Sequence, residues 1–334
     1  MQAIQIPQFG EPVDVARVTT VSPLKLPRGC VRVRMLVSPI NPSDLMTIRG
    51  VYTLRPDLPF TPGYEGVGVV EESHAGLFGR FLLGKRVAVL QSRTGNWAEF
   101  SVASARSVIP LPRELDHAQA AMFFVNPATA YVLCKHVLNV PRGAWLVQSA
   151  AASAVGRMVI RLGKKEGFRT LNIVRREEQR EELLASGADA VLVFDPSQHD
   201  ADHFRQSVQQ TVGPAGIRYA IDPVGGATAT AIAAELGQNG HLVLYGSLSS
   251  NPLQVDSRQL LSQTARIEGF WLGQYMTTLS LLGKLRLIRE LVRLHREGVL
   301  GSTVGQIYPL TELTTALKHA EEPGKAGKIL LQFR

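Results

Sequence analysis

The chain has 334 residues, of which 45% are hydrophobic and 19% charged, a balance typical of a folded globular protein. This length predicts about two domains. Lys and Arg outnumber Asp and Glu by 36 to 28; the net charge of +8 favours anionic ligands, and the scattering of the basic residues argues against a nucleic-acid partner. The two cysteines, Cys30 and Cys134, exclude a disulfide scaffold.

The N-terminal stretch MQAIQIPQFGEP has neither the basic segment nor the apolar run of a signal peptide. No apolar run anywhere reaches the length of about eighteen residues that a spanning helix needs. We therefore expect a cytoplasmic protein without a membrane partner.

The first third of the chain predicts short strands separated by turns. Residues 30–40, 65–73 and 85–92 alternate apolar and polar side chains, as half-buried strands do. Pro and Gly are frequent between these segments, which indicates tight turns. This pattern is typical of a barrel-like β domain.

The pattern changes near residue 117, where residues 116–137 predict a helix interrupted at Asn126-Pro127. Strands and helices then alternate, as in a doubly wound parallel sheet. The expected strands are 144–150, 169–175, 189–195, 217–225 and 241–248, and the expected helices are 154–167, 177–187, 203–213 and 227–240. A basic amphipathic helix is expected at 284–297, and the last strand, 327–333, is expected to return to the β domain.

The stretch SAAASAVGR, residues 149–157, lies where a dinucleotide-binding loop would join a strand to a helix. Such a loop needs small side chains, so that backbone N–H groups can approach a pyrophosphate at the helix N-terminus. Ala and Ser meet this need, and Gly156 permits close packing of helix and strand. A strand–helix unit without a ligand is the alternative.

The next strand ends in IVRREE, with Arg175 and Arg176 where an NAD site usually has an acidic residue. Two guanidinium groups suit a 2′-phosphate, which favours NADPH over NADH. The alternative is a pair of surface charges that pair with Glu177 and Glu178.

Several motifs in a fixed order resemble the medium-chain dehydrogenase/reductase superfamily over nearly the whole chain. They are INPSDL (40–45), PGYEGVGVV (62–70), GNWAEF (95–100), NPATAY (126–131), SAAASAVG (149–156), IDPVGG (221–226) and GKILL (327–331). The resemblance implies an α/β protein with a Rossmann domain at 119–265 and a GroES-like, mostly β catalytic domain at 1–118 and 266–334. It also implies a homodimer, joined through edge strands such as HLVLYG (241–246).

Zinc-dependent members of that superfamily carry a Cys near the INPSD position and a His in a GHE motif. This chain has Asn41 and Tyr64 in those regions and lacks a four-cysteine lobe. We therefore expect a zinc-independent reductase with no metal site.

Two zinc-independent groups fit the chain. The resemblance to the 2-enoyl thioester reductases lies in GVYTLRPDLP (50–59), NPATAY and GFWLGQY (269–275). The chain also resembles the NADPH:quinone oxidoreductases, which share much of the same pattern of motifs. The first resemblance implies NADPH-dependent reduction of a trans-2-enoyl thioester, carried on CoA or acyl carrier protein, in a cleft between the domains. The alternatives are a quinone or enone reductase and an NADPH-binding protein without turnover.

The resemblance also implies roles for single residues. Tyr52 matches the catalytic Tyr, which would donate a hydrogen bond or proton, and Asn126 matches a residue beside the nicotinamide. Glu65 is interpreted as structural, and no spacing pairs it with Asp44. The remaining cofactor matches are Ser153, Ala154, Val155, Tyr245, Gly246, Ser247, Leu248, Phe270, Trp271, Leu272 and Lys328.

Overall fold

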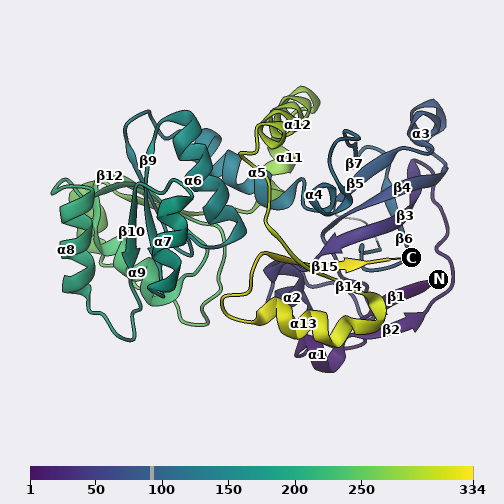
Figure 1. Ribbon diagram of the computed structural model, residues 1–334, viewed down its shortest axis with the longest axis horizontal. Helices are drawn as coiled ribbons and strands as arrows, with labels where there is room; N and C mark the ends of the chain where they lie inside the picture. The colour runs from purple at the N-terminus through teal and green to yellow at the C-terminus, as the bar shows by residue number, and fades with distance from the viewer. Residues whose placement is uncertain (91–93, 334) are drawn as a thin grey trace. The chain divides into compact units, whose positions relative to one another are not determined.

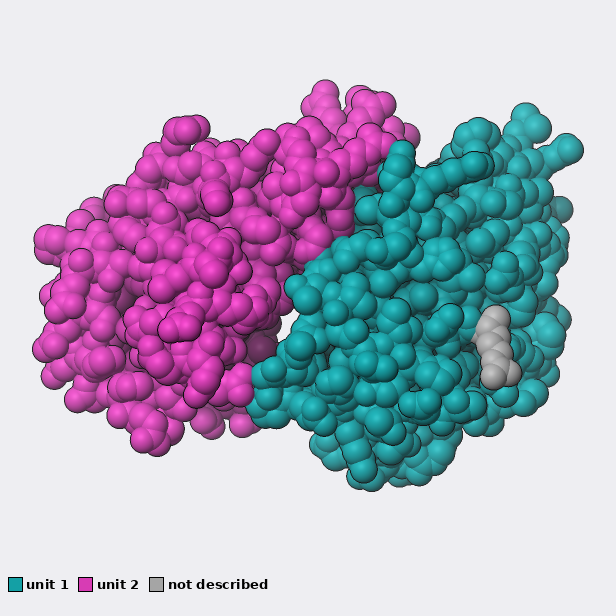
Figure 2. All heavy atoms as spheres, viewed as in Figure 1, with its two compact units in different colours: residues 1–125, 302–334 teal, residues 126–301 magenta. Residues whose placement is uncertain are grey.

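The computed structural model describes residues 1–90 and 94–333 and divides the chain into two compact units, coloured separately in Figure 2. Unit 1 comprises Met1–Val125 and Ser302–Arg334, and unit 2 comprises Asn126–Gly301. Residues 266–301 therefore group with the Rossmann unit, and not with the β domain as expected from the sequence. The reason is that β13 (Arg266–Gly269) pairs with the sheet of unit 2.

Unit 1 is built on a seven-stranded sheet of order β14-β15-β3-β4-β5-β7, with β6 also paired to β3. The alternation expected at 30–40 is confirmed, because Val31, Val33 and Met35 are buried while Arg32 and Arg34 are partly exposed. The strands are β3 (Cys30–Pro39), β4 (Glu65–Ser73), β5 (Arg86–Leu90), β6 (Phe100–Ser104), β7 (Val108–Pro110), β14 (Val304–Pro309) and β15 (Lys328–Gln332), with a separate pair, β1 (Gln2–Gln5) and β2 (Arg17–Thr20). Positions 91 and 92 of the strand expected at 85–92 lie outside the described residues.

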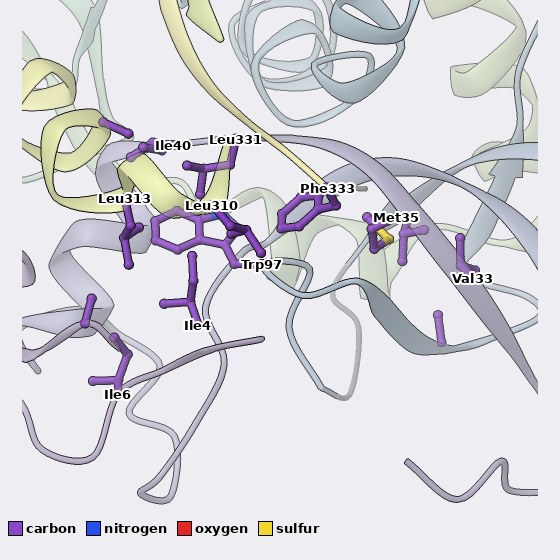
Figure 3. Packing of buried hydrophobic residues seen from close by; sticks show 14 of the residues in the cluster. Ile4, Ile6, Val33, Met35, Ile40, Trp97, Leu310, Leu313, Leu331 and Phe333 are labelled. Atoms are coloured by element: carbon purple, nitrogen blue, oxygen red, sulfur yellow. The ribbon is translucent and has the colours of Figure 1, made fainter. Parts of the chain in front are cut away.

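The core of unit 1 joins the two ends of the chain. Figure 3 shows the buried ring of Trp97 among Ile4 and Ile6 from the N-terminal segment and Leu331 and Phe333 from the C-terminal one. The expected return of the last strand is confirmed, because β15 pairs antiparallel with β3. The helices of this unit are α1 (Pro12–Val15), α2 (Pro42–Ile48), α3 (Gly76–Leu82), α4 (His117–Ala121) and α13 (Leu313–Glu321), with a short 3₁₀ turn at Leu310–Glu312.

Unit 2 contains a parallel six-stranded sheet of order β10-β9-β8-β11-β12-β13 (Figure 1). Successive residues face opposite sides: Ile173 and Leu192 pack with α8 and α9, whereas Val174 and Val191 pack with α6 and α7. The strand order reverses between β8 and β11, which is where doubly wound sheets bind nucleotides. The strands are β8 (Trp145–Gln148), β9 (Arg169–Val174), β10 (Ala190–Val193), β11 (Ile217–Asp222), β12 (Leu236–Leu244) and β13.

The helices of unit 2 are α5 (Val125–Val132), a π-helix (Leu133–Val137), α6 (Ala154–Glu166), α7 (Glu178–Ala185), α8 (Ala201–Thr211), α9 (Gly226–Ala234), α10 (Ser257–Gln263), α11 (Leu272–Thr278) and α12 (Leu281–Arg296). Across residues 1–90 and 94–333, no helix is long and apolar enough to cross a bilayer.

Three expectations for unit 2 are corrected. The break in the helix expected at 116–137 falls before Val125, because Pro127 occupies the first turn of α5, where a proline needs no N–H partner. The helix expected at 227–240 ends at Ala234, and β12 already begins at Leu236. Residues 241–244 lie in β12, which pairs on both sides with β11 and β13, so HLVLYG is an interior strand and not a sheet edge.

Candidate functional site

The loop after β8 forms a tight turn into α6. Ser153 begins the helix, and its Oγ accepts a hydrogen bond from the backbone N–H of Gly156 at 3.1 Å. A Cβ at Gly156 would lie 2.6 Å from the Cα of Ala151, so only glycine fits at this turn of the loop. The first turn of α6, with Ala154 and Val155, thus has small side chains and N–H groups free of helical partners, which suits an anionic pyrophosphate.

A buried carboxylate joins this loop to the neighbouring strand. The Ser149 hydroxyl donates to Asp222 Oδ1, and the Gly225 N–H donates to Asp222 Oδ2 at 2.6 Å. Burial raises the pKa of Asp222, and these hydrogen bonds oppose that rise. The pair crosses the reversal point between β8 and β11. Both motifs are visible in the sequence, but no spacing pairs them.

Arg175 and Arg176 follow the last residue of β9, and both are exposed. Glu177 pairs with Arg180 at 2.5 Å instead of with either of them. In the described part of the chain, neither Arg175 nor Arg176 makes an ion pair or a side-chain hydrogen bond. Hydrogen bonds from Ser197 lower the pKa of the Asp195 carboxyl, and the charge of Arg175 adds to that effect. Two guanidinium groups are therefore available to an anion beside the carboxyl end of β9.

The other predicted cofactor residues of unit 2 follow strands of the same parallel sheet. Tyr245 follows β12, and its N–H donates to the Asp222 carbonyl at 2.9 Å. Phe270 follows β13, and its N–H donates to the Leu244 carbonyl at 2.7 Å. Since the carboxyl ends of parallel strands meet at one edge, residues 153–155, 175–176, 245–248 and 270–272 share that edge.

Asn126 and Tyr245 each carry a buried polar group without a partner. In the described ranges, the Nδ2 of Asn126 has no hydrogen-bond partner, and neither has the hydroxyl of Tyr245. Tyr245 faces Ser153 without a hydrogen bond of ordinary geometry, and burial raises the pKa of its phenol. Buried groups without partners are unfavourable unless a ligand or water satisfies them. Together with the close approach at Gly156, they fit a dinucleotide.

In unit 1, Tyr52 lies half-buried in the irregular segment between α2 and β4. Its ring packs against the ring of Tyr64, with the centroids 5.6 Å apart. The Tyr64 and Thr47 hydroxyls lie 2.7 Å apart, and Thr47 donates its own hydrogen to the Ser43 carbonyl at 2.8 Å. Because Thr47 has a single hydroxyl hydrogen, Tyr64 must be the donor in this pair. Burial raises the pKa of Tyr64 to about 12. Tyr64 therefore has a structural partner for its proton.

Two buried carboxyl groups lie beside this segment. Asp44 accepts hydrogen bonds from the N–H of Asn41 at 2.8 Å and from the N–H of Tyr64 at 3.0 Å, which fixes the start of α2 to the start of β4. Glu65 accepts from Asn41 Nδ2 at 3.0 Å and from the Val125 N–H at 2.9 Å. These contacts agree with the structural interpretation of Glu65.

Lys328, on β15, lies close enough to both carboxyl groups to interact with their charges, an association that no spacing in the sequence indicates. Burial lowers the pKa of Lys328 to about 8, and the nearby Glu65 and Asp44 oppose that shift. Burial likewise raises the pKa of Asp44 to about 7 and raises the pKa of Glu65. The three groups form a buried cluster next to the segment that carries Tyr52.

The described residues offer no cluster of metal-ligating side chains. Across residues 1–90 and 94–333, no group of three His, Cys, Asp or Glu side chains could hold a metal ion. Cys30 and Cys134 are both buried, one in each unit. Zinc independence remains a prediction from the sequence.

Comparison with known proteins identifies both units. Residues 154–285 match the zinc-binding dehydrogenase family, and residues 27–113 match the alcohol dehydrogenase GroES-like domain. The mitochondrial enoyl-[acyl-carrier-protein] reductase of Arabidopsis thaliana is 32% identical over 335 residues, which cover 98% of this chain and 86% of the relative.

Solved structures share the fold over its full length. A crystal structure from Bacillus thuringiensis, described as a candidate NADPH:quinone reductase, has a TM-score of 0.91 and 34% identity and covers 100% of this chain and 99% of its own. A mycobacterial structure complexed with NADPH has a TM-score of 0.87 and 27% identity and covers 99% of each chain. The chain therefore belongs to the medium-chain dehydrogenase/reductase superfamily of oxidoreductases, with enoyl-[acyl-carrier-protein] reductases among its relatives.

Proposed function

We propose that the chain reduces the carbon–carbon double bond of a trans-2-enoyl thioester with NADPH. The observation that carries this proposal is the half-buried phenol of Tyr52. Tyr52 lies at the position that resembles the catalytic Tyr of the 2-enoyl thioester reductases. The likeness to a mitochondrial enoyl-[acyl-carrier-protein] reductase over 98% of the chain supports the choice of substrate.

The dinucleotide is bound at the carboxyl edge of the sheet in unit 2. The first turn of α6, at residues 153–155, holds the pyrophosphate, and Arg175 and Arg176 hold the 2′-phosphate. Residues 245–248 and 270–272 line the cofactor, and Asn126 offers its unpaired amide to the nicotinamide side. Lys328 contributes a positive charge from β15. When bound, NADPH supplies a hydride to the β-carbon of the substrate.

Tyr52 stabilises the charge that develops on the substrate. Once the β-carbon is reduced, negative charge accumulates on the thioester carbonyl oxygen as an enolate, and a hydrogen-bond donor at that oxygen lowers the barrier. A phenol keeps its proton at neutral pH and can therefore donate. Tyr64 does not compete for this role, because its hydroxyl already donates to Thr47.

The test follows NADPH oxidation by the purified protein with crotonyl-CoA, a longer trans-2-enoyl-CoA and a quinone in parallel. We expect turnover of the enoyl thioesters and a fall of at least about 100-fold in kcat for Tyr52→Phe, the range for loss of one donor. Tyr64→Phe is the matched control and should retain kcat within about twofold. Enoyl turnover that is equal in Tyr52→Phe and wild type would contradict the role of Tyr52.

A quinone reductase is the second candidate, and the 34% identity to the Bacillus thuringiensis protein favours it. Quinone turnover that is unaffected by Tyr52→Phe, without enoyl turnover, would establish this alternative. Tight NADPH binding without turnover of any acceptor would instead indicate a binding protein.

We also propose a homodimer. The free edges of the unit 2 sheet are β10 and β13, so an edge contact would use one of these strands. Light scattering would then give twice the chain mass of 36.4 kDa. The cytoplasmic location stays a prediction from the sequence; the Arabidopsis thaliana relative is named as mitochondrial.

A further inference from the structure

The short helix α3 and Leu83, the residue after it, expose four large apolar side chains to solvent. Leu77 is 85% exposed, Phe78 53%, Phe81 64% and Leu83 44%. Figure 1 shows α3 at the edge of unit 1, beyond the end of β4. We call these four residues the α3 patch. Single exposed apolar residues are common, but a group of this kind is typical of a surface that binds a protein or a membrane.

The opposite face of α3 packs against unit 1 and so holds the α3 patch toward solvent. Gly79 and Leu82 are buried beneath the helix. A Cβ at Gly79 would collide with the Ser73 hydroxyl and lie 2.7 Å from the Cβ of Ala75, so the helix backbone lies directly on the chain below it. Since the helix is anchored on this face, the patch cannot turn inward without loss of packing.

Unpaired cations flank the patch along α3. Arg80 is exposed on the helix itself, and Lys85 follows it. The Lys85 ammonium lies 4.5 Å from the centroid of the Phe81 ring. A lysine held beside an exposed aromatic ring matches the water–lipid boundary, where rings enter the interface and ammonium groups reach the headgroups.

Two further cations lie at the corner where α3 begins. The N–H of Gly29 donates to the His74 carbonyl at 2.9 Å, and the N–H of Ala105 donates to the Gly29 carbonyl at 3.0 Å. These bonds bring the exposed side chains of Arg28 and Arg106 to the start of the helix.

The two acidic residues near the end of β4, the strand before α3, form ion pairs. Glu72 pairs with Arg32 and Glu71 pairs with Arg34, each at 2.5 Å. In the described chain, Arg28, Arg80, Lys85 and Arg106 make no ion pair. The surroundings of the patch therefore carry a net positive charge.

We propose that the α3 patch docks on an anionic lipid bilayer. The apolar side chains enter the interface, and the surrounding cations contact the phosphate headgroups. A second copy of the chain would set like charges against one another and is disfavoured. The patch lies on the connection between β4 and β5, and two open cavities of about 490 and 380 Å³ lie at other residues. This peripheral contact needs no spanning helix, which was the basis for expecting no membrane partner.

The test is flotation of the full-length protein with vesicles of phosphatidylcholine alone or with about 30 mol% phosphatidylglycerol. We expect binding at least about tenfold stronger to the anionic vesicles, lost at about 0.5 M salt. Phe78→Ser/Phe81→Ser and Arg80→Gln/Lys85→Gln should each weaken binding at least about tenfold. Leu261→Ser is the matched control, because Leu261 is 79% exposed on α10 and should leave binding within about twofold.

A second readout does not depend on lost binding. Cys30 and Cys134 are buried, so Leu77→Cys can be labelled selectively with a polarity-sensitive dye. We expect its fluorescence to rise with anionic vesicles and not with phosphatidylcholine. NADPH binding and thermal unfolding check that every variant is folded.

Three results would overturn the proposal. The first is no binding to anionic vesicles, or binding that the α3 variants leave unchanged. The second is binding to polyglutamate without binding to vesicles, which would assign the patch to an acidic protein. The third is concentration-dependent self-association that Phe78→Ser/Phe81→Ser abolishes, without vesicle binding, which would assign it to a second copy.

Discussion

Replacing both Arg175 and Arg176 by Ala should remove the preference for NADPH over NADH. Both side chains are exposed, and neither makes an ion pair in the described ranges, so the change leaves no buried charge without a partner. An exposed charge pair contributes up to about 1 kcal/mol. Two guanidinium groups on one 2′-phosphate therefore contribute about 2 kcal/mol together, or about 30-fold in kcat/KM.

The assay compares kcat/KM for NADPH and for NADH at one fixed acceptor concentration. We expect NADPH to lose about 30-fold and NADH to change by less than about twofold, because NADH has no 2′-phosphate. Fluorescence titration of both dinucleotides gives the same comparison without turnover. Arg180→Ala is the control, since that arginine follows on α7 and already pairs with Glu177 at 2.5 Å.

Equal losses for NADPH and NADH would refute this reasoning, because they would indicate damage to the loop instead of a lost phosphate contact. An unchanged preference would place the 2′-phosphate elsewhere. Loss of stability would not explain either result, because exposed substitutions of this kind shift the unfolding free energy by no more than about 0.5 kcal/mol.

Three further predictions concern single side chains. Gly156→Ala sets a methyl group 2.6 Å from loop backbone and should lower the unfolding free energy by about 1–3 kcal/mol and weaken NADPH binding. Gly283→Ala, whose new methyl has only ordinary contacts, should lower neither, and equal behaviour of the two variants in urea denaturation would contradict the clash. The folded state holds the Asp44 proton up to a pKa of about 7, above the ordinary value near 4, so unfolding free energy should fall as pH rises through that window. Asp44→Asn should flatten this dependence by up to about 1.4 kcal/mol per pH unit, and an unchanged slope would count against the burial of that carboxyl. Tyr64→Phe removes the hydroxyl that donates to Thr47 and should cost about 1 kcal/mol in denaturation, whereas no loss would mean that the bond contributes nothing.

The fold was largely predictable because its elements repeat simple periods. The alternation of apolar and polar residues in 30–40 correctly predicts β3. The alternation of strands and helices after residue 144 correctly predicts the parallel sheet. Boundaries were harder wherever two apolar segments adjoin. The alanine-rich run 227–234 continues without a strong break into Leu236. The sequence pattern therefore predicts a helix through the residues that form the start of β12.

The edge to which we assign the cofactor was predictable in outline because parallel strands place their carboxyl ends together. The loop at 149–157 and the arginines at 175 and 176 could be located from strand order alone. The Ser149–Asp222 hydrogen bond could not, since it depends on β8 and β11 being neighbours although two strands separate them in the sequence.

The cluster of Asp44, Glu65 and Lys328 shows the limit of sequence spacing. Its members are brought together by register: the N–H of Ile40 donates to the carbonyl of Ile329 at 2.9 Å, which sets the start of β15 beside the end of β3. A pairing between the two ends of a chain leaves no local pattern in either segment.

The most direct test of the central claim follows deuterium from NADPH labelled at the transferable C4 position into a trans-2-enoyl-CoA. Mass spectrometry of the acyl product locates the label. The proposed reaction predicts a saturated thioester with one deuterium on the β-carbon, and label on the α-carbon only when the solvent is D₂O. A protein that oxidises NADPH with a quinone but yields no saturated thioester would contradict it.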